Sequence, residues 1–402
     1  MKIAISGAGI GGLAAALCLH EKGHDVRVYE AVERLQPLGV GINVMPHASG
    51  VLHGLGVGAA LDEMAIRTRA IEYRTRFGHL IQSDPRSVEA GFEYPQYSVH
   101  RGELQFLLLE AVRSRMGQDA VVLGKAVSSF TQDERGVHTD FADGTRHECD
   151  LLIGADGFRS MVRRQLHPQE APPHYEGTMM WRGANLQAPF ADGRTMFIAG
   201  DHDVKFVCYP ISGRAARDGK ALINWVAEVR HDRPRAAEEA DWTREGDRDF
   251  IAGFSGFQMP DLDISALLKN TQKITQYPMI DRDPLPWWTE GRVTLLGDAA
   301  HPMYPMGANG ASQAIIDARV LAHSLAAQPG PKGLLTYEAI RRPLTTEVVL
   351  NNRNSGPERV LDIAAARVKG PEDRIKDLIS AAELEEVAAN YRQVAGFLKR
   401  AV

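Results

Sequence analysis

The chain has 402 residues, enough for two or three domains with large buried cores. Its 51 acidic residues outnumber its 46 lysines and arginines, and a net charge of -5 offers no general attraction to nucleic acid or anionic lipid. An apolar content of 44% excludes intrinsic disorder, and three cysteines far apart in the sequence build neither a disulfide framework nor a thiolate metal site, which favours a reducing, cytoplasmic compartment.

Residues 2–29 predict a βαβ unit: a buried strand at 2–6, a helix at 11–22 and a second strand at 25–29. Glycines within the apolar start would break the helical segment of a signal peptide, so this stretch is interpreted as part of the fold. No later apolar run reaches the length of about 18 residues that a membrane span needs, and we expect none.

The first strand is joined to the first helix by the turn Gly7-Ala8-Gly9-Ile10-Gly11-Gly12, which satisfies G-x-G-x-x-G. The first glycine of this motif permits the tight turn, the second lets the backbone approach a pyrophosphate at the helix N-terminus, and the third allows close packing of helix on strand. Glu30, at the end of the second strand, can accept hydrogen bonds from ribose hydroxyls. The unit therefore predicts a dinucleotide-binding site.

A second motif, H-E-x-x-H, occurs at His20-Glu21-Lys22-Gly23-His24 and is typical of zinc sites. Gly23 stands where the first helix should end, and beyond a glycine cap the two imidazoles cannot share one helix face. We therefore expect no metal site.

Along the rest of the chain, mixed helices and strands give way to strands alone and then return. Helices are expected at 47–62 and 102–116, strands and loops at 70–97, a hairpin from 121–130 and 137–141, and a strand at 151–153. From 176 to 230 strand-like segments follow one another without helices between them, which predicts a separate, mainly antiparallel sheet, and the polar stretch 231–250 predicts a solvated loop or exposed helix. A strand at 292–296, a helix at 309–327 and a helical C-terminus follow, with an apolar stripe that we expect to dock on the body of the chain, at Leu384, Val387, Tyr391, Val394 and Leu398.

Two further strand ends carry a glycine and an aspartate. The strand at 151–153 leads to Asp156-Gly157, and the strand at 292–296 leads to Gly297-Asp298. Such ends suit an extended cofactor that needs hydroxyl acceptors far from its pyrophosphate, as a ribityl chain does.

Together and in this order, the three motifs resemble the single-component FAD-dependent aromatic hydroxylases with the p-hydroxybenzoate hydroxylase fold, over about residues 1–350. Residues 37–43, 94–98, 181–183 and 303–313 are most similar to the phenazine hydroxylase branch. The resemblance implies an α/β fold: a Rossmann-like FAD-binding domain with an inserted, mainly antiparallel β substrate domain and a helical C-terminus. The expected boundaries are 1–75, 98–175 and 276–345 for the FAD-binding domain, 76–97 and 176–275 for the substrate domain, and 346–402 for the C-terminal helical region.

The resemblance also implies which residues bind FAD. Arg101 would contact the cofactor, with Gln105 one helical turn further on, and Asp298 would hold a ribityl hydroxyl. For Arg101 and Asp298 an ordinary ion pair is the alternative. Asp156 and Gly157 would support both FAD and a visiting nicotinamide. The other cofactor-binding residues expected are Gly41, Val127, Gly297 and, at a helix N-terminus that would meet the flavin pyrimidine, Ala308, Asn309, Gly310 and Ala311.

The implied activity is hydroxylation of an aromatic or N-heteroaromatic ring with FAD, O2 and NADH or NADPH, through a flavin C4a-hydroperoxide. Because no second nucleotide motif follows a strand, the nicotinamide has no domain of its own. The catalytic residues expected near the reacting ring are Pro305, Gly307, Tyr304 and Arg182. The expected substrate contacts, for which ordinary core packing is the alternative, are Trp181, Tyr209, Pro210, Trp225 and Met306.

The role of Arg182 and the class of flavoprotein both leave alternatives open. Arg182 would pair a substrate carboxylate, or else Asp281 or Asp283. A flavin-binding regulator, or a redox protein without hydroxylating activity, would share the same motifs, whereas a flavin-dependent halogenase is disfavoured because W-x-W-x-I-P is missing. The expected partners are a small aromatic substrate, O2 and NAD(P)H, and the chain would act as a monomer or a homodimer.

Overall fold

The computed structural model describes residues 1–37, 40–231, 244–354 and 358–394, with side chains described as far as Val387. Most of the polar stretch predicted at 231–250, Leu398, and the side chains of Tyr391 and Val394 lie outside the described residues.

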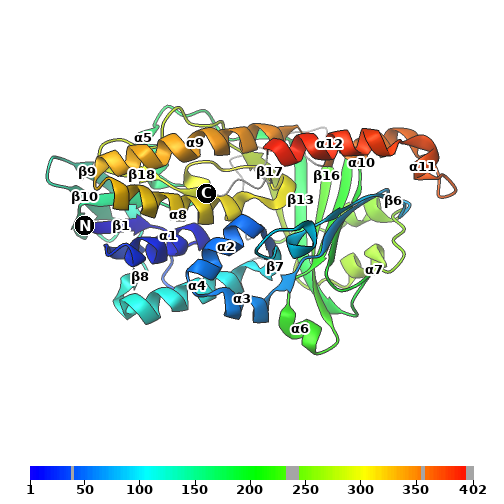
Figure 1. Cartoon of the computed structure of the whole chain (residues 1–402), viewed down its shortest axis with the longest axis horizontal. Coiled ribbons are helices and arrows are strands. Elements are labelled where there is room, and N and C mark those ends of the chain that lie inside the picture. Colours follow the sequence, from blue (N-terminus) through cyan, green and yellow to red (C-terminus); the bar gives the residue numbers. More distant parts are fainter. Residues whose placement is uncertain (38–39, 232–243, 355–357, 395–402) are drawn as a thin grey trace.

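A parallel sheet forms one half of the molecule (Figure 1). Its strand order is β18 (Val293–Leu295), β12 (Leu151–Gly154), β1 (Lys2–Ser6), β2 (Asp25–Tyr29) and β8 (Val121–Val122). The predicted βαβ unit is confirmed, because β1 and β2 pair in parallel from Lys2 with Asp25 to Ser6 with Tyr29. The predicted hairpin strand at 121–130 is wrong in its first residues, since Val121 and Val122 leave the hairpin and pair with β2.

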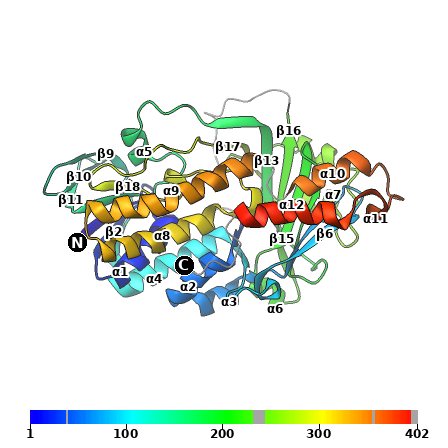
Figure 2. The same cartoon turned by 45° about the horizontal axis from the view of Figure 1, so that its top comes forward.

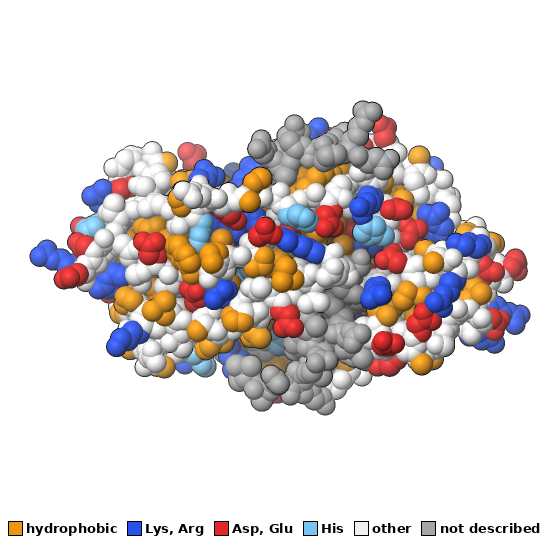
Figure 3. Space-filling model, turned by 90° about the horizontal axis from the view of Figure 1, so that it is seen from above, with side chains coloured by type: hydrophobic (Ala, Val, Ile, Leu, Met, Phe, Trp, Pro, Cys, Tyr) orange, Lys and Arg blue, Asp and Glu red, His pale blue; other side chains and the backbone are white. Residues whose placement is uncertain are grey.

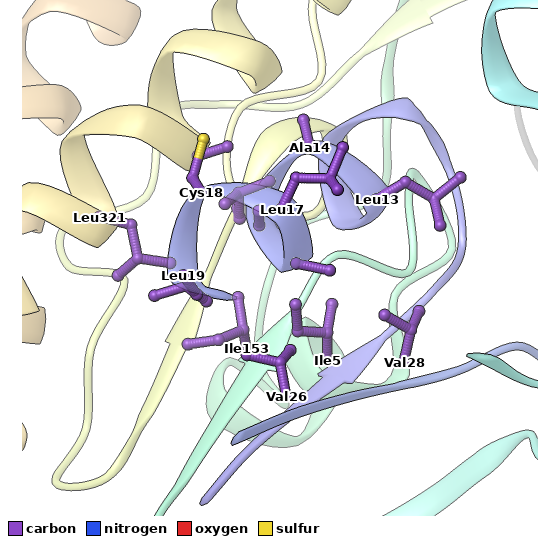
Figure 4. Close-up of a cluster of buried hydrophobic side chains, with 14 of the residues drawn as sticks. Ile5, Leu13, Ala14, Leu17, Cys18, Leu19, Val26, Val28, Ile153 and Leu321 are labelled. Carbon is purple, nitrogen blue, oxygen red and sulfur yellow. The ribbon is translucent and has the colours of Figure 1, made fainter. Parts of the chain in front are cut away.

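Helices cover the parallel sheet in layers. Helix α1 (Ile10–Glu21) packs against α4 (Arg101–Met116) and α8 (Gly310–Ala327), and α9 (Pro331–Arg353) packs on α8, in front of it in Figure 2. Nine of the twelve residues of α1 are buried, which is why this helix is rich in alanine and leucine on all sides. Figure 4 shows its Leu13 and Leu17 above the strand residues Ile5, Val28 and Ile153.

The first helix ends at Glu21, and Gly23 follows with a φ of 80°. His20 and His24 are therefore not on one helix face, as predicted. Among the described residues no cluster of histidine, cysteine and carboxylate side chains is arranged to hold a metal ion. None of the helices in the described ranges has the length and apolar character that crossing a bilayer requires.

A seven-stranded sheet forms the other half. Its order is β17 (Thr275–Asp281), β13 (His174–Gln187), β16 (Ala221–Arg230), β15 (Val204–Pro210), β14 (Thr195–Gly200), β5 (Ala70–Arg74) and β6 (Leu80–Pro85). The pairs are antiparallel except β14 with β5, which confirms the mainly antiparallel sheet. Strand β5 falls inside the range 1–75 that is expected for the FAD-binding domain, but its pairing with β14 places it in this sheet.

Both faces of the seven-stranded sheet are covered. The outer face packs on α7 (Ile264–Lys269) and the 3-10 helix η4 (Asp249–Phe254). The inner face packs on α10 (Arg359–Arg367) and on η6 (Met306–Ala308). The C-terminal α12 (Ala381–Val394) contributes Leu384 and Val387 to this inner cluster, so the described part of the predicted apolar stripe docks on the chain itself.

The remaining elements are shorter. Strands β3 (Gly41–Val44), β7 (Tyr97–His100) and β4 (Ile66–Arg67) form a small antiparallel sheet, and β11 (Arg146–Cys149), β10 (Val137–Phe141) and β9 (Val127–Gln132) form another. The single helix predicted at 47–62 is two helices, α2 (Pro46–Gly54) and α3 (Gly58–Met64), because Gly56 takes a left-handed φ of 73° between them. The remaining short helices are α5 (Met161–Leu166), α6 (Gly213–Arg217), α11 (Ile375–Leu378), η1 (Ser87–Ala90), η2 (Gln118–Ala120) and η5 (Gly297–Ala299).

Candidate functional site

The turn between β1 and α1 is shaped by its glycines. Gly7 has a φ of 104° and donates its N–H to the carbonyl of Tyr29 at 2.7 Å. A Cβ on Gly12 would lie 2.0 Å from the carbonyl oxygen of Gly7, whereas a Cβ on Gly9 would meet no atom within 4 Å. Gly7 and Gly12 are therefore required by packing within the protein, and Gly9 borders open space at the N-terminus of α1. A pyrophosphate-binding turn needs this combination.

Two side chains form hydrogen bonds with the backbone of the glycine turn. Glu30 accepts the N–H of Ala8 at 2.8 Å and that of Val32 at 3.1 Å, and Gln105 of α4 donates to the carbonyl of Ala8 at 2.7 Å. Each carboxylate oxygen of Glu30 keeps a lone pair that a ribose hydroxyl can use. Ala8, Ile10 and Val127 are buried, so none of the three offers an exposed side chain to a cofactor.

The three strand ends identified in the sequence lie side by side. A Cβ on Gly7 would be 2.4 Å from the carbonyl oxygen of Ala155, and a Cβ on Gly11 would be 3.0 Å from side-chain atoms of Leu296 and Ala314. The glycine turn therefore contacts both the Asp156-Gly157 loop and the Gly297-Asp298 loop. All three loops leave the carboxyl ends of neighbouring parallel strands, where α/β sheets bind their ligands.

Asp298 is the exposed residue of its turn, although both of its neighbours are buried. In the described part of the chain its carboxylate forms no ion pair, so the ordinary ion pair is not observed. Arg101, the first residue of α4, is likewise exposed and unpaired there, and its backbone N–H donates to the carbonyl of Val40 at 2.9 Å. Both side chains are thus available to a ligand.

A buried network fixes the Gly297-Asp298 turn from below. Asp317 of α8 accepts the N–H of Gly297 at 3.1 Å and a hydrogen bond from His301 Nε2 at 2.6 Å through one oxygen, and one from Arg341 Nε at 2.6 Å through the other. Arg341 also donates to Gln313 at 2.5 Å. Burial opposes the charge of Asp317, but His301 and Arg341 more than offset it and lower the pKa of Asp317 to about 2.

None of the three side chains in this network is among the residues predicted from the sequence. The available signal was a single acidic side chain in the apolar run Ala314-Ile315-Ile316-Asp317-Ala318, because a buried carboxylate in a helix needs partners. Its partner Arg341 lies on the next helix and could not be assigned from spacing.

We expect Asp317→Asn to weaken FAD binding about tenfold, since its amide nitrogen would face a donor where the carboxylate now accepts one. The dissociation constant of FAD, measured by flavin fluorescence on apo-protein, checks this. Glu338→Gln is the matched control: this buried carboxylate of α9 accepts the N–H of Thr289 at 2.8 Å, outside the flavin turn. Equal FAD affinities in the two variants would remove Asp317 from the site.

The carboxylate of Asp156 accepts hydrogen bonds from residues of its own loop. Its carboxylate accepts the Ser160 hydroxyl at 2.5 Å and the N–H of Met161 at 2.8 Å, which caps α5. Burial raises the pKa of Asp156, and these hydrogen bonds act against that rise. Gly157 has a φ of 76° and would place a Cβ in open space. Asp156 therefore stabilises the loop conformation, and the missing side chain of Gly157 would let a ligand approach the backbone there.

The loop before α8 brings backbone close to the same region. Gly307 and Ala308 take left-handed φ values of 66° and 55°, and Pro305 is exposed. A Cβ on Gly310, the first residue of α8, would lie 3.9 Å from Asp298 Oδ1. Asn309 is buried and Ala311 is half-buried beside it. The helix N-terminus thus presents small residues and backbone next to Asp298, a fit for the pyrimidine edge of a flavin.

Arg182 joins the inner face of the seven-stranded sheet to β3. Its guanidinium donates to the carbonyl of Gly41 at 2.6 Å and to the Tyr277 hydroxyl at 3.1 Å. Gly41 also donates its N–H to Asn224 at 2.7 Å. The proposed pairing of Arg182 with Asp281 or Asp283 is not observed, since both aspartates bind Arg353.

Strand alternation separates the other predicted substrate contacts. Tyr209 belongs to the inner cluster with Met306, and Pro210 ends the same strand. Trp181 and Trp225 belong to the outer cluster: Trp181 stacks on Phe250 at 4.7 Å, and Trp225 donates to Thr271 at 3.0 Å. The two tryptophans lie on the sheet face opposite to Tyr209 and Met306, which does not support their predicted role as substrate contacts.

Tyr304 and Met306 are both buried in the inner cluster. The Tyr304 hydroxyl is hydrogen-bonded to His174 at 3.0 Å, and burial raises the pKa of Tyr304. The Met306 sulfur accepts from Lys205 at 3.3 Å. Both side chains line a small pocket that Leu361 of α10 borders. They tie the loop to the substrate-side sheet in this structure.

Fold and site together define a flavin-binding α/β protein: three loops at parallel strand ends suit an FAD, and a separate sheet faces the flavin side. The family model described as FAD binding domain matches residues 1–352, and the chain belongs to this family.

Similar proteins define the class further. The chain is 44% identical to a phenazine 1,6-dicarboxylic acid hydroxylase of Lysobacter antibioticus over 88% of this chain and 89% of that one. It is 32% identical to a 6-hydroxynicotinate 3-monooxygenase of Pseudomonas fluorescens over 81% and 82% of the two chains. The solved structure of Klebsiella pneumoniae HpxO complexed with FAD and uric acid superposes with a TM-score of 0.74 at 26% identity, covering 98% and 93% of the chains. The protein is an FAD-dependent aromatic monooxygenase of the NAD(P)H-using class, which confirms the predicted fold class, cofactor and activity.

Proposed function

We propose that the substrate is a planar N-heteroaromatic carboxylic acid of the phenazine type. The observation that carries this proposal is that the guanidinium of Arg182, on the inner sheet face, has no carboxylate partner in the described part of the chain. Arg182 is partly buried there, and no described carboxylate lies within the 4 Å of an ion pair. Its Nε–H is buried without a hydrogen-bond partner in the described ranges. A guanidinium in that setting favours a ligand carboxylate, which can bind it in bidentate fashion.

The rest of the face suits a flat ring system. Met180, Val207, Val226 and Met279 lie beside Tyr209 in the inner cluster. Apolar and thioether side chains pack on ring faces and adapt to their outline, so they select for planarity more than for one substitution pattern. The similarity to the phenazine 1,6-dicarboxylic acid hydroxylase supports a fused ring carrying a carboxylate.

The cofactor and the residues around it would have separate roles in the reaction. Bound FAD would accept a hydride from NADH or NADPH and activate O2. The positive end of α8, at Gly310, would stabilise negative charge on the pyrimidine edge of the flavin. Arg182 would orient the substrate by its carboxylate, and the apolar inner face would keep water from the reacting ring. We also propose a cytoplasmic location, which the three free and buried cysteines support.

The test compares phenazine-1-carboxylate with its carboxamide, scored by substrate-stimulated NADH oxidation, O2 uptake and a hydroxylated product in mass spectrometry. Arg182→Met should raise KM for the acid about tenfold to a hundredfold and leave KM for the carboxamide nearly unchanged, because only the acid loses an ion pair. Tyr277→Phe is the control, since it removes a hydrogen-bond partner of Arg182 and keeps the charge.

Two outcomes would count against the proposal. If Arg182→Met raised both KM values equally, Arg182 would serve only to hold Gly41. If neither compound stimulated NADH oxidation while a monocyclic acid did, the phenazine-type substrate would be wrong.

A further inference from the structure

Asn224 of β16 is a buried amide of which only the oxygen is used within the described protein. The residue is 0% exposed, and its Oδ1 accepts the N–H of Gly41 at 2.7 Å. This hydrogen bond fixes the orientation of the amide, because the N–H of Gly41 needs an acceptor. Nδ2 is therefore the donor end, and it is buried without a hydrogen-bond partner in the described ranges. A buried donor of this kind is unfavourable until a ligand or a water satisfies it.

Strand pairing places Asn224 among the residues of the inner sheet face. It lies opposite Tyr209 of β15 on one side and opposite Ala184 of β13 on the other. Arg182 stands two residues before Ala184 and is therefore the diagonal neighbour of Asn224, a position that lies about 7 Å away in a sheet. The next residue along the strand, Trp225, belongs to the outer cluster, so alternation puts Asn224 on the face of Tyr209.

Arg182 and Asn224 bind the same backbone residue from neighbouring strands. Arg182 donates to the carbonyl of Gly41 at 2.6 Å, and Asn224 accepts the N–H of Gly41. A Cβ on Gly41 would lie 2.8 Å from two side-chain atoms of Asn224, so the glycine packs directly on the amide. Each of the two side chains keeps one buried N–H group without a partner in the described part of the chain, on Nε of Arg182 and on Nδ2 of Asn224. Two donors fixed in this way suit a ligand with two acceptors on one edge.

We propose that Asn224 is a specificity-determining residue, which donates from Nδ2 to a ring nitrogen beside the substrate carboxylate that Arg182 binds. This role rests on the proposed function, because it needs a carboxylate at Arg182. When the nitrogen of a fused ring lies next to the carboxylate-bearing carbon's edge, its lone pair and the carboxylate oxygens point to the same side of the ring plane. An analogue with a C–H group at that position would leave the buried donor unpaired and would be rejected.

Charge on the surface cannot supply this selectivity. On the face of the molecule drawn in Figure 3, acidic and basic side chains lie intermixed. A surface of this kind acts on the net charge of a ligand, and isomeric acids carry the same charge. Discrimination between such isomers therefore has to come from groups that contact the ring, as Asn224 would.

Acridine-4-carboxylate and acridine-1-carboxylate are the probes that test this role. The two isomers share their charge and outline, but only the 4-isomer has its ring nitrogen beside the carboxylate. Their dissociation constants are measured on the FAD-loaded protein from the change in flavin absorbance, at a pH where the ring nitrogen is unprotonated. The wild type should bind the 4-isomer about tenfold more tightly. Asn224→Asp keeps an oxygen for Gly41 but removes the donor, and it should lose this preference.

Three further variants make the comparison specific. Asn185→Asp is the matched control, since this amide on β13 donates to Leu267 at 3.3 Å and accepts from Trp225 at 3.2 Å on the outer face, and the preference should remain about tenfold. Asn224→Leu removes the donor without adding a charge and should also abolish the preference. Arg182→Met should weaken both isomers alike, because the ion pair is common to them. Bound FAD, measured by absorbance, reports that each variant is folded.

The outcomes separate this role from the proposed function. Equal affinities of the wild type for the two isomers would exclude the role of Asn224, and so would a preference that both Asn224→Asp and Asn224→Leu retain. In either case the proposed function would stand if Arg182→Met still weakened both acids. If neither isomer bound to the wild type, or if Arg182→Met changed neither affinity, the proposed function would be wrong and the role of Asn224 with it.

Discussion

Asp298→Ala should be purified without FAD and with an intact fold. Its carboxylate is exposed at the end of the 292–296 strand and forms no described ion pair, so its loss removes nothing that holds the apo-protein together. A flavin bound across the strand ends would lose an acceptor for a ribityl hydroxyl, and we expect the FAD dissociation constant to rise about a hundredfold. Absorbance of the purified variant and fluorescence titration of its apo-form measure this.

Controls separate this effect from general damage. Asp143→Ala changes an exposed turn aspartate that binds Lys125 and Thr145 in the β10–β11 hairpin, and it should keep its FAD. Asp298→Asn retains a carbonyl acceptor and should fall between wild type and Asp298→Ala. A full complement of FAD in Asp298→Ala would show that Asp298 does not bind the cofactor.

Much of the flavin-side architecture could be predicted because its signals are local. A glycine turn between strand and helix, and two strand ends that each carry a glycine and an aspartate, depend on a few consecutive residues each. Their meeting follows from the rule that parallel strands carry their ligands at the carboxyl edge, and the contacts of Gly7 with Ala155 and of Gly11 with Leu296 agree with it. The boundary error at β5 has a non-local cause, since that strand is assigned by its partner β14.

The substrate side could not be predicted to the same depth. Trp181 and Trp225 share a face because Gly183 pairs with Trp225. Alternation along a single strand gives neither this register nor the face that meets the flavin. Because helices cover both faces of the sheet, both are apolar, and hydrophobicity does not distinguish them. Arg182 carried the better signal: it is one residue from Trp181 and therefore on the opposite face, where it holds Gly41.

Gly9→Ala should lose FAD affinity without losing stability, which would identify Gly9 as the position of closest approach to the pyrophosphate. The backbone at Gly9 has φ -71° and ψ 178°, which alanine adopts without strain, and the added Cβ would meet no protein atom within 4 Å. The methyl group would stand only in the path of a ligand at the N-terminus of α1. We expect the apo-protein to keep its Tm and the FAD dissociation constant to rise about tenfold or more.

Gly12→Ala, three residues away, is the matched contrast and should fail for a different reason. Its Cβ would lie 2.0 Å from the carbonyl oxygen of Gly7, a backbone atom that the hydrogen bond from Gly7 to Tyr29 holds in place. Relieving that overlap requires moving α1 from β1, so we expect the apo-protein to lose more than about 2 kcal/mol of stability. Thermal unfolding of both apo-variants, beside FAD titration, separates a ligand clash from a packing clash. If Gly9→Ala bound FAD as tightly as the wild type, the pyrophosphate would not lie against Gly9. The glycines of the turn would then be explained by packing within the protein alone.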